Sequence, residues 1–262
     1  SFFEESISRP KKNSEQFSEI NKWLISRFYS RTKDFFKYFD EFRIREAYVT
    51  ILYEFLSDIN YHERRTNYEE TLDVMNFIAH DYLKLMTPVI PHICEEFNEK
   101  LKNKLEISLQ NFTTDTTKYI DEKNEKNEKI IENIIANVSR TKDTKNIAEL
   151  KTIQIITASK LRYQLFEFMD KILKQTRDFK TIFDKIKSEP KFESEMKFVQ
   201  KFLPKTIKEG LTTYIKEEIE TKLLNNTKKF IEKEFNCKVE IISTDKYNKD
   251  VNAIPGEPHI VV

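Results

Sequence analysis

The chain of 262 residues contains only two glycines, Gly210 and Gly256. Glycine makes up about 7% of an average globular protein. Glycine-lined turns let a backbone approach phosphate groups, so neither a dinucleotide-binding G-x-G-x-x-G loop nor a P-loop can occur here. The G-x-S-x-G nucleophile elbow of hydrolases is excluded in the same way. The sequence therefore argues against catalytic folds that are built on glycine-lined phosphate turns.

The remaining composition is that of a folded, non-membrane protein. Hydrophobic residues make up 39% of the chain and include 21 phenylalanines, which is enough for a core. The formal net charge is +1, so any nucleic-acid binding must come from local basic patches. No apolar run reaches the ~18 residues of a membrane span. Cys94 and Cys237 lie far apart in the sequence and form no metal-binding spacing. With only two cysteines, a reducing, cytoplasmic location is the default expectation.

Residues 1–105 have the apolar spacing of amphipathic helices. One stripe begins at Ile44 and ends at Ile59, and a second begins at Leu72 and ends at Met86. Thr66 or Asn67, followed by two glutamates, is a plausible start for the second helix. An earlier stripe holds Phe17, Ile20, Leu24 and Phe28, and a later one begins near Pro91. Short connections between helices are typical of an antiparallel bundle, which we expect over residues 1–105.

The pattern of residues 106–262 predicts an α+β domain with a short sheet. Residues 121–129 read as the exposed opening of a helix that continues to Val138, and helical patterns return from Lys160 to about Phe235. Three short β-branched segments are strand candidates: residues 151–157 (KTIQIIT), 238–243 (KVEIIS) and 258–262 (PHIVV). The last strand is entered through the turn signal Ile254-Pro255-Gly256. We therefore expect a mainly α protein with a short sheet in its second domain.

We find no catalytic or metal-binding constellation in the sequence. The four histidines form none of the patterns H-x-E, H-E-x-x-H or C-x-x-H. His92 and Cys94 are close together, but a zinc site needs two more ligands that the surrounding sequence does not offer. We interpret Cys94 as a small buried residue. No catalytic residue, metal ligand or cofactor is predicted for this chain.

Basic residues gather in three places. Residues 171–208 hold eleven lysines or arginines against five acidic residues, and this segment includes Lys174 and Lys180. Such a patch suits phosphate contacts, although a solvated lysine-rich surface would look the same. Arg43 and Arg45 stand at the start of a predicted helix, and Arg64 and Arg65 stand at its end. Each arginine could contact RNA or pair with a neighbouring carboxylate.

Three segments of the first half, residues 21–36, 41–65 and 83–97, carry motifs in a recognisable order. Their order and content resemble the helical anticodon-binding domain of class I aminoacyl-tRNA synthetases. NKWLISRFYSRTKDFF (residues 21–36) is similar to the "W-x-L-S-R" helix of this family, and EFRIREAYVTILYEFLSDINYHERR follows at residues 41–65. LKLMTPVIPHICEEF (residues 83–97) resembles the "L-x-P-F-x-P-H-x-x-E-E-x-W" segment. Phe97 stands where the family usually has tryptophan.

Two segments of the second half, residues 230–243 and 252–262, narrow the resemblance. They resemble the end of the archaeal and eukaryotic leucyl-tRNA synthetases. FIEKEFNCKVEIIS and the final NAIPGEPHIVV are similar to the closing segments "FLE-x-E-F-G-x-x-V-x-I" and "A-x-P-G-x-P-A-I-x-V" of that branch. Asn236 replaces the glycine of the E-F-G turn, and asparagine also tolerates positive φ. His259 replaces a small residue. The resemblance covers nearly the whole chain.

The H-I-G-H and K-M-S-K-S motifs of the synthetase catalytic domain are absent. The resemblance thus implies a C-terminal portion of a ligase used in translation, which is inactive without its catalytic domain. It could be a piece of a longer chain or a separate subunit. ATP and magnesium would belong to the missing catalytic domain. The implied partners are leucine tRNA and that catalytic domain, with no DNA and no membrane.

The resemblance also implies where tRNA is bound. In the leucine branch, the C-terminal domain engages the long variable arm of leucine tRNA. The tail would approach the tip of that arm, while lysines hold phosphates and arginines contact the tRNA from the bundle. The alternative for the tail is an ordinary sheet strand. The tail candidates are Pro255, Gly256, Pro258, His259, Ile260 and Val261.

Two other functions remain open from the sequence. The chain could be the equivalent region of a valine, isoleucine or methionine enzyme, although the A-x-P-G-x-P tail argues against the first two. It could also be a helical module that docks on another protein without touching RNA. RNA binding weakens steeply with salt, whereas hydrophobic docking does not, so a salt series separates these functions.

Overall fold

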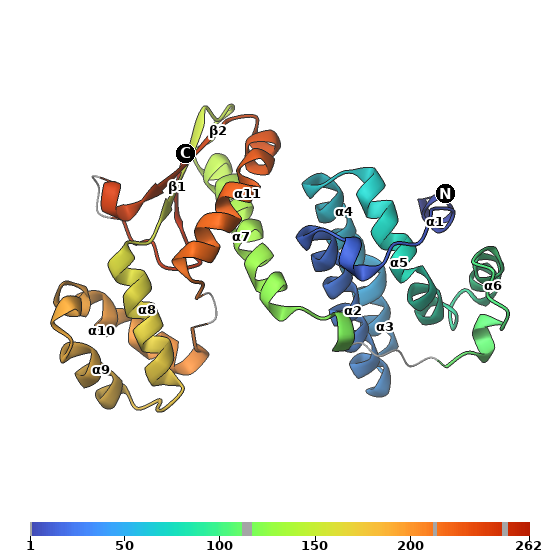
Figure 1. The fold of residues 1–262 in the computed structure, drawn as a ribbon, viewed down its shortest axis with the longest axis horizontal. Coiled ribbons are helices and arrows are strands. Elements are labelled where there is room, and N and C mark those ends of the chain that lie inside the picture. Colours follow the sequence, from blue (N-terminus) through green and yellow to red (C-terminus); the bar gives the residue numbers. More distant parts are fainter. Residues whose placement is uncertain (1, 112–116, 212–213, 248–250) are drawn as a thin grey trace. The chain divides into compact units, whose positions relative to one another are not determined.

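A computed structural model describes residues 2–111, 117–211, 214–247 and 251–262 (Figure 1). The fold is mainly helical with one small sheet, as the sequence predicts. The chain forms two compact units, residues 1–125 and 126–262. Residues 107–111 and 117–125 belong to the first unit, where Ile107 is buried and its N–H donates to Glu95. The domain boundary near residue 106, which the sequence predicts, stays a prediction.

The first unit is a helical bundle. Its helices are α1 (Phe2–Ile7), α2 (Glu19–Asp40), α3 (Ile44–Val49), α4 (Phe55–Arg65), α5 (Tyr68–Met86) and α6 (Pro91–Lys100). The predicted stripe from Ile44 to Ile59 is helical throughout, but a π-helical turn at Thr50–Glu54 separates α3 from α4. Phe17 is buried, yet it precedes α2 because Ser18 caps that helix.

Local signals define the helix ends of this unit. The side chain of Asn67 accepts a hydrogen bond from the N–H of Glu70 at 2.9 Å, which confirms the predicted start of α5. Pro91 is the first residue of α6, where a missing N–H costs nothing. Trp23 is 1% exposed and Cys94 is fully buried, so both belong to the core, as the sequence predicts for Cys94.

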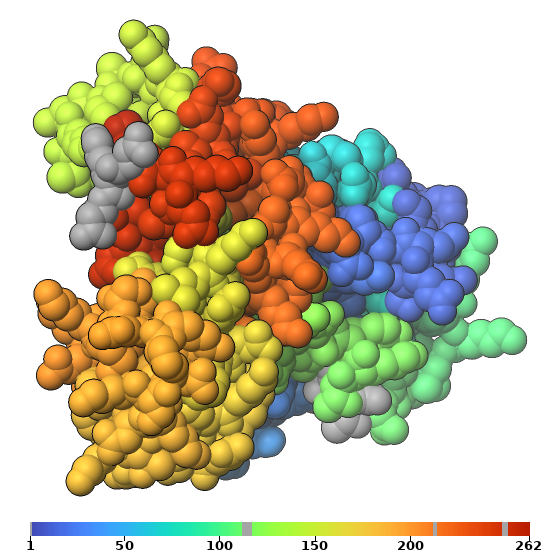
Figure 2. Space-filling model, turned by 60° about the vertical axis from the view of Figure 1, so that its left-hand side comes forward, coloured from blue at the N-terminus to red at the C-terminus, as the bar shows by residue number. Residues whose placement is uncertain are grey.

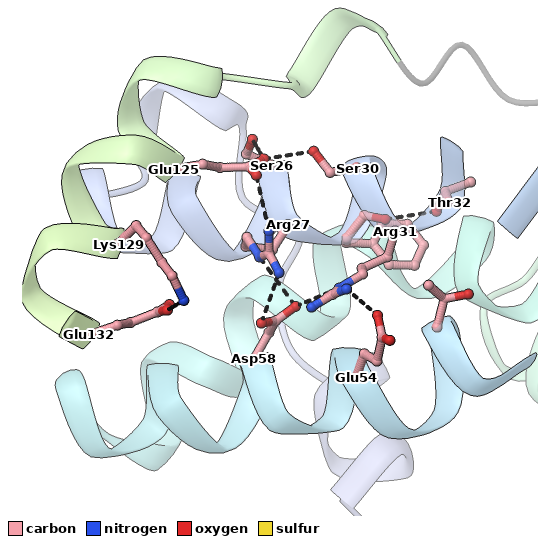
Figure 3. Close-up of polar contacts among 12 residues, drawn as sticks. Ser26, Arg27, Ser30, Arg31, Thr32, Glu54, Asp58, Glu125, Lys129 and Glu132 are labelled. Atoms are coloured by element: carbon pink, nitrogen blue, oxygen red, sulfur yellow. Dashed lines mark hydrogen bonds and ion pairs between the residues drawn. The ribbon is translucent and has the colours of Figure 1, made fainter. Parts of the chain in front are cut away.

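Buried polar groups join the helices of the first unit. Arg27 of α2 lies between Asp58 of α4, at 3.3 Å, and Glu125, at 3.2 Å (Figure 3). Arg31 lies one turn further along α2 and pairs with Asp58 and Glu54. These contacts explain why arginine recurs in the segment at residues 21–36. Both side chains are engaged within the bundle.

The second unit surrounds a three-stranded sheet. Its helices are α7 (Glu122–Thr144, which begins in the first unit), α8 (Lys160–Leu173), α9 (Phe179–Lys187), α10 (Met196–Glu209) and α11 (Glu217–Phe235). The strands are β1 (Thr152–Thr157), β2 (Lys238–Ser243) and β3 (His259–Val261), which confirms the three predicted strands.

The sheet order is β2-β1-β3, with β1 in the centre. β2 runs parallel to β1 and β3 runs antiparallel to it. Asn236 ends α11 with φ 48° and ψ 48°, the left-handed conformation expected for the residue that replaces glycine. This cap reverses the chain so that β2 can pair with β1. The C-terminal strand β3 is therefore an edge strand.

Candidate nucleic-acid interface

Arg43 and Arg45 lie at the start of α3, on the surface of the first unit. Arg43 pairs with Glu41 and Glu46, at 3.3 Å each, and its guanidinium lies 4.5 Å from the ring centroid of Tyr38. The pKa of Arg43 is raised by its hydrogen bond to Glu46. Arg45 is exposed and forms no ion pair with any described residue. Arg45 is thus the more available of the two for a phosphate.

Arg64 and Arg65 lie in the last turn of α4. Arg64 is exposed, with its guanidinium 5.9 Å from the ring centroid of Tyr61, and Arg65 is half-buried. The run from α3 through α4 is helical from Ile44 to Arg65. At 1.5 Å per residue, its two ends are about 30 Å apart. The structure therefore does not bring the two arginine pairs into one patch.

Lys174 and Lys180 are both exposed, near α8 and α9 of the second unit. Lys174 pairs with Asp170, one turn earlier, at 2.6 Å. Lys180 lies in the first turn of α9 and forms no ion pair within the described ranges. Neither lysine lines the polar groove or the α10 cavity described below. Their surroundings are those of an open basic surface.

The tail begins with a tight turn. Ile254 and Glu257 form a two-way backbone bridge around Pro255 and Gly256, whose φ is +82°. Proline followed by a glycine with positive φ is the pattern of a type II turn. Pro255 and Gly256 are buried, Pro258 is half-buried and His259 is exposed. The first two residues support the turn, and the residues after it reach the surface.

Ile260 and Val261 are half-buried in β3, where Ile260 pairs with Ile155 and Val261 pairs with Gln154 of β1. In Figure 2, the C-terminal segment (red) lies at the surface of the second unit, above the orange segment that contains α10. The sheet pairing and the exposure of the tail thus occur together. A tail strand that pairs in the sheet can still offer its outer edge to a ligand.

A polar groove of about 290 Å³ runs between α7 and the tail. Asn133, Asn137 and Arg140 line it from α7, and Pro258 and His259 line it from the tail. The three α7 side chains are exposed and follow helical spacing, and they make no side-chain hydrogen bond or ion pair with another described residue. Amide groups and an arginine can hydrogen-bond base edges and phosphates.

The sequence analysis missed the contribution of α7 to this groove. The sequence of this segment predicts a helix and no binding role. The available signal was two asparagines and an arginine on the polar face of an amphipathic helix. That signal is weak without knowledge that the tail, more than one hundred residues later, returns to the same face.

Glu220 of α11 lies under the tail turn and is fully buried. Its Oε2 accepts hydrogen bonds from the Tyr163 hydroxyl at 2.7 Å and from the Gly256 N–H at 3.0 Å. Burial raises the pKa of this carboxyl to about 7, and these two hydrogen bonds oppose the shift. Burial also raises the pKa of Tyr163, which keeps that hydroxyl protonated. Glu220 therefore acts as an anchor for the turn.

The described residues contain no cluster of histidine, cysteine or carboxylate groups that could hold a metal ion. Within the same ranges, every helix is too short or too polar for a membrane crossing. The geometry thus offers polar and basic surface for binding.

Comparison with known proteins agrees with this geometry. The chain matches the family described as "Anticodon-binding domain of tRNA ligase" over residues 21–157, just over half of its length. It is 31% identical over 255 residues to the leucine--tRNA ligase of Methanococcus maripaludis (strain C7), which is 97% of this chain and 26% of that protein.

Two further relatives are similar over the same extent. The leucine--tRNA ligase of Methanocaldococcus jannaschii is 31% identical over 99% of this chain and 26% of its own length. The leucine--tRNA ligase of Pyrococcus horikoshii is 28% identical over 96% of this chain and 26% of its own length. The chain spans about a quarter of the length of these curated relatives. Together with the helical bundle of residues 1–125, the family match shows that this chain belongs to the anticodon-binding domains of tRNA ligases.

Proposed function

We propose that the chain binds leucine tRNA in the cytoplasm and positions it for ATP-dependent aminoacylation by a catalytic domain that is not part of this chain. The tRNA body would lie along the bundle, and the long variable arm would reach the second unit. ATP and magnesium would act in the catalytic domain. The similarity to leucine--tRNA ligases over 97% of the chain supports this proposal.

The polar groove between α7 and the tail is the observation that carries the proposal. It joins exposed amides and Arg140 of α7 with the exposed side chain of His259. Unpaired bases at the tip of an RNA arm present their edges, whereas the deep groove of an A-form duplex hides them. A rigid strand beside hydrogen-bonding side chains suits such bases.

The test measures binding of the chain to leucine tRNA with and without its long variable arm, over a salt series. We expect the intact tRNA to bind more tightly, with affinity falling as salt rises. Equal, weak and salt-sensitive binding to both RNAs would reduce the function to non-specific phosphate attraction. Binding to neither RNA would favour a protein-docking module, and preference for valine, isoleucine or methionine tRNA would assign a related enzyme.

Arg140→Ala is the sharpest variant for the groove, because the side chain is exposed and its removal leaves the core intact. Lys142→Ala is the matched control, because it lies two residues further, about 200° round the helix. We expect only Arg140→Ala to weaken binding of the intact tRNA. Deleting the tail would be a poorer test, since Pro255 and Gly256 are buried and β3 pairs with β1.

The first unit also has an apolar surface that suits the proposed catalytic domain. An apolar cavity of about 320 Å³ lies between α1, α4, α5 and α6. Leu56, Ile90 and Ile93 line it and are 50%, 36% and 49% exposed. Contiguous exposed apolar surface of this kind marks protein interfaces. Ile93→Asp should abolish association with a separately supplied catalytic domain and leave the helix content unchanged.

A further inference from the structure

A second cavity, of about 480 Å³, lies in the second unit beside α10. Its lining is basic and aromatic: Arg162 comes from α8, Lys197, Phe198, Lys201 and Phe202 come from α10, and Val251 and Asn252 precede the tail. The volume falls within the ~300–1,000 Å³ range of small-ligand sites. Asn252 lines both this cavity and the groove beside the tail. The two hollows therefore share a border.

Arg162 is held rigidly at the back of this cavity. Its Nε donates to Glu195 at 3.1 Å, and its Nη1 donates to the carbonyl oxygen of Ala253 at 2.8 Å and to Asn252 at 3.2 Å. The Nη2 group has no hydrogen-bond partner in the described part of the chain. The side chain is 13% exposed, so it cannot swing freely. A guanidinium that is fixed in place and has one amino group without a partner is preorganised to donate hydrogen bonds to an anion.

The aromatic side chains form a flat surface next to this guanidinium. The guanidinium carbon of Arg162 lies 4.7 Å from the ring centroid of Phe198. Phe198 in turn stacks on Phe202, with centroids 5.1 Å apart and ring planes 18° apart. Both rings are half-buried: they pack against the core of this unit, with centroids 6.2 Å and 5.3 Å from that of Phe166, and keep part of their surface exposed. Arginine planes and aromatic rings are the surfaces on which unpaired bases stack.

Two lysines flank the stack. Lys197 and Lys201 are exposed, lie one helical turn apart and form no ion pair with a described carboxylate. In the same basic segment Lys171 pairs with Glu167, Lys174 with Asp170 and Lys205 with Glu209, whereas Lys180 forms no ion pair with a described residue either. The cavity thus places two unpaired lysines beside half-exposed aromatic rings. This combination matches a ligand that is both flat and anionic.

We propose that this cavity, which we call the α10 pocket, binds an unpaired nucleotide of the RNA that the chain holds. The base extends the stack of Phe198 and Arg162, while Lys197 and Lys201 contact the phosphates on either side. This inference rests on the proposed function and adds a second nucleotide site to the groove beside the tail. The shared Asn252 allows one continuous strand to occupy both. An acidic peptide would satisfy the lysines but not the aromatic stack.

The test uses an RNA hairpin with a ten-nucleotide unpaired loop and a blunt duplex of equal charge. Two variants are measured for binding, Phe198→Leu and Lys201→Glu, with circular dichroism to confirm their folding. Lys187→Glu is the control, because Lys187 is exposed, belongs to the same basic segment and does not line the pocket. Phe198→Leu should weaken hairpin binding about tenfold and leave duplex binding unchanged. Lys201→Glu should weaken hairpin binding more than Lys187→Glu.

Photo-cross-linking locates the bound base. A 5-iodouridine is placed at each loop position in turn, and the cross-linked peptide is identified by mass spectrometry. Cross-links to residues 197–202 that disappear in Phe198→Leu support the pocket. Cross-links confined to residues 133–140 and 251–262, with unchanged affinity in both variants, would contradict the α10 pocket. Such a result would still support RNA binding in the groove beside the tail. An equal loss of hairpin affinity in Lys201→Glu and Lys187→Glu also overturns the pocket. Full displacement of the RNA by polyglutamate does the same. Absence of binding to leucine tRNA by the unmodified chain overturns the proposed function instead.

Discussion

The buried carboxylate of Glu220 accepts a hydrogen bond from the backbone N–H of Gly256 at 3.0 Å. Glu220 belongs to α11, and Gly256 is the residue with positive φ in the turn that opens the tail. Tyr163 of α8 donates to the same carboxylate oxygen at 2.7 Å. One side chain therefore ties the C-terminal turn to two helices. The position of β3, and with it the wall of the tail groove, depends on this tie.

Stability should fall with rising pH where Glu220 titrates. Its pKa rises from 4.5 when unfolded to about 7 when folded, because burial penalises the charged form. The folded state therefore holds the proton more tightly. The contribution of Glu220 to the free energy of unfolding is complete below pH 4.5. It is lost as the pH rises to about 7, and the total loss is about 3 kcal/mol. Urea unfolding followed by circular dichroism at pH 5 and pH 7.5 measures it.

Glu220→Gln provides the comparison, because the amide keeps an acceptor for Gly256 and Tyr163 but carries no proton to lose. When the unfolding free energies of the two proteins are subtracted, the contributions of all other titrating groups cancel. We expect that difference to change between pH 5 and pH 7.5 in favour of the variant. A constant difference across this range would show that Glu220 is not protonated preferentially in the folded state.

Gly256→Ala should destabilise the second unit by about 1–2 kcal/mol, because its φ of +82° disfavours a side chain. It should also reduce the preference for leucine tRNA with an intact variable arm, since the turn sets the path of His259. Gly210 is the internal control: its φ is +76°, and an added Cβ would meet nothing within 4 Å. Gly210→Ala should cost similar stability without altering RNA preference.

The first unit should lose stability in acid through His62. This side chain is fully buried and joins three helices: Nε2 donates to Asn21 at 2.9 Å, and Nδ1 lies 2.8 Å from the Thr71 hydroxyl. Burial lowers its pKa from 6.5 to about 4. As the pH falls, the unfolded chain binds the His62 proton before the folded chain does. About 3 kcal/mol of unfolding free energy is therefore lost between pH 6.5 and pH 4.

Trp23 is the only tryptophan and packs on Tyr61 with ring centroids 5.2 Å apart, so its fluorescence reports on the first unit alone. Urea titrations read by this fluorescence should give a lower midpoint at pH 4.5 than at pH 7. A midpoint that does not change with pH would contradict the assignment of His62 as a neutral link.

Arg45 should contribute more to RNA binding than Arg43. Arg45 is exposed and forms no ion pair with any residue that the structure describes, whereas Arg43 is held by Glu41 and Glu46. Arg45→Ala should lower the affinity for tRNA and reduce the slope of log affinity against log salt by about one. Its unfolding free energy should change by less than about 0.5 kcal/mol. A larger effect from Arg43→Ala would reverse this assignment.

Local chemistry accounts for the elements that the sequence predicts correctly. Asn67 and Pro91 mark helix starts, Asn236 marks a helix end, and the Pro255-Gly256 pair marks a turn. Each signal acts within a few residues, since caps and turns are closed by hydrogen bonds between near neighbours. The π-helical turn at Thr50–Glu54 has no such signal and was not predicted.

The sequence by itself determined the helical stripes, the three strands, the turn before the tail and the absence of glycine-lined phosphate loops. Only the tertiary structure decided that β3 pairs beside β1, that Glu220 is buried under Gly256, and that α7 and α10 each face the residues around Asn252. The physical reason is separation along the chain. Helical and strand patterns depend on neighbours a few residues away, whereas both candidate RNA sites join side chains that are far apart until the second unit has folded.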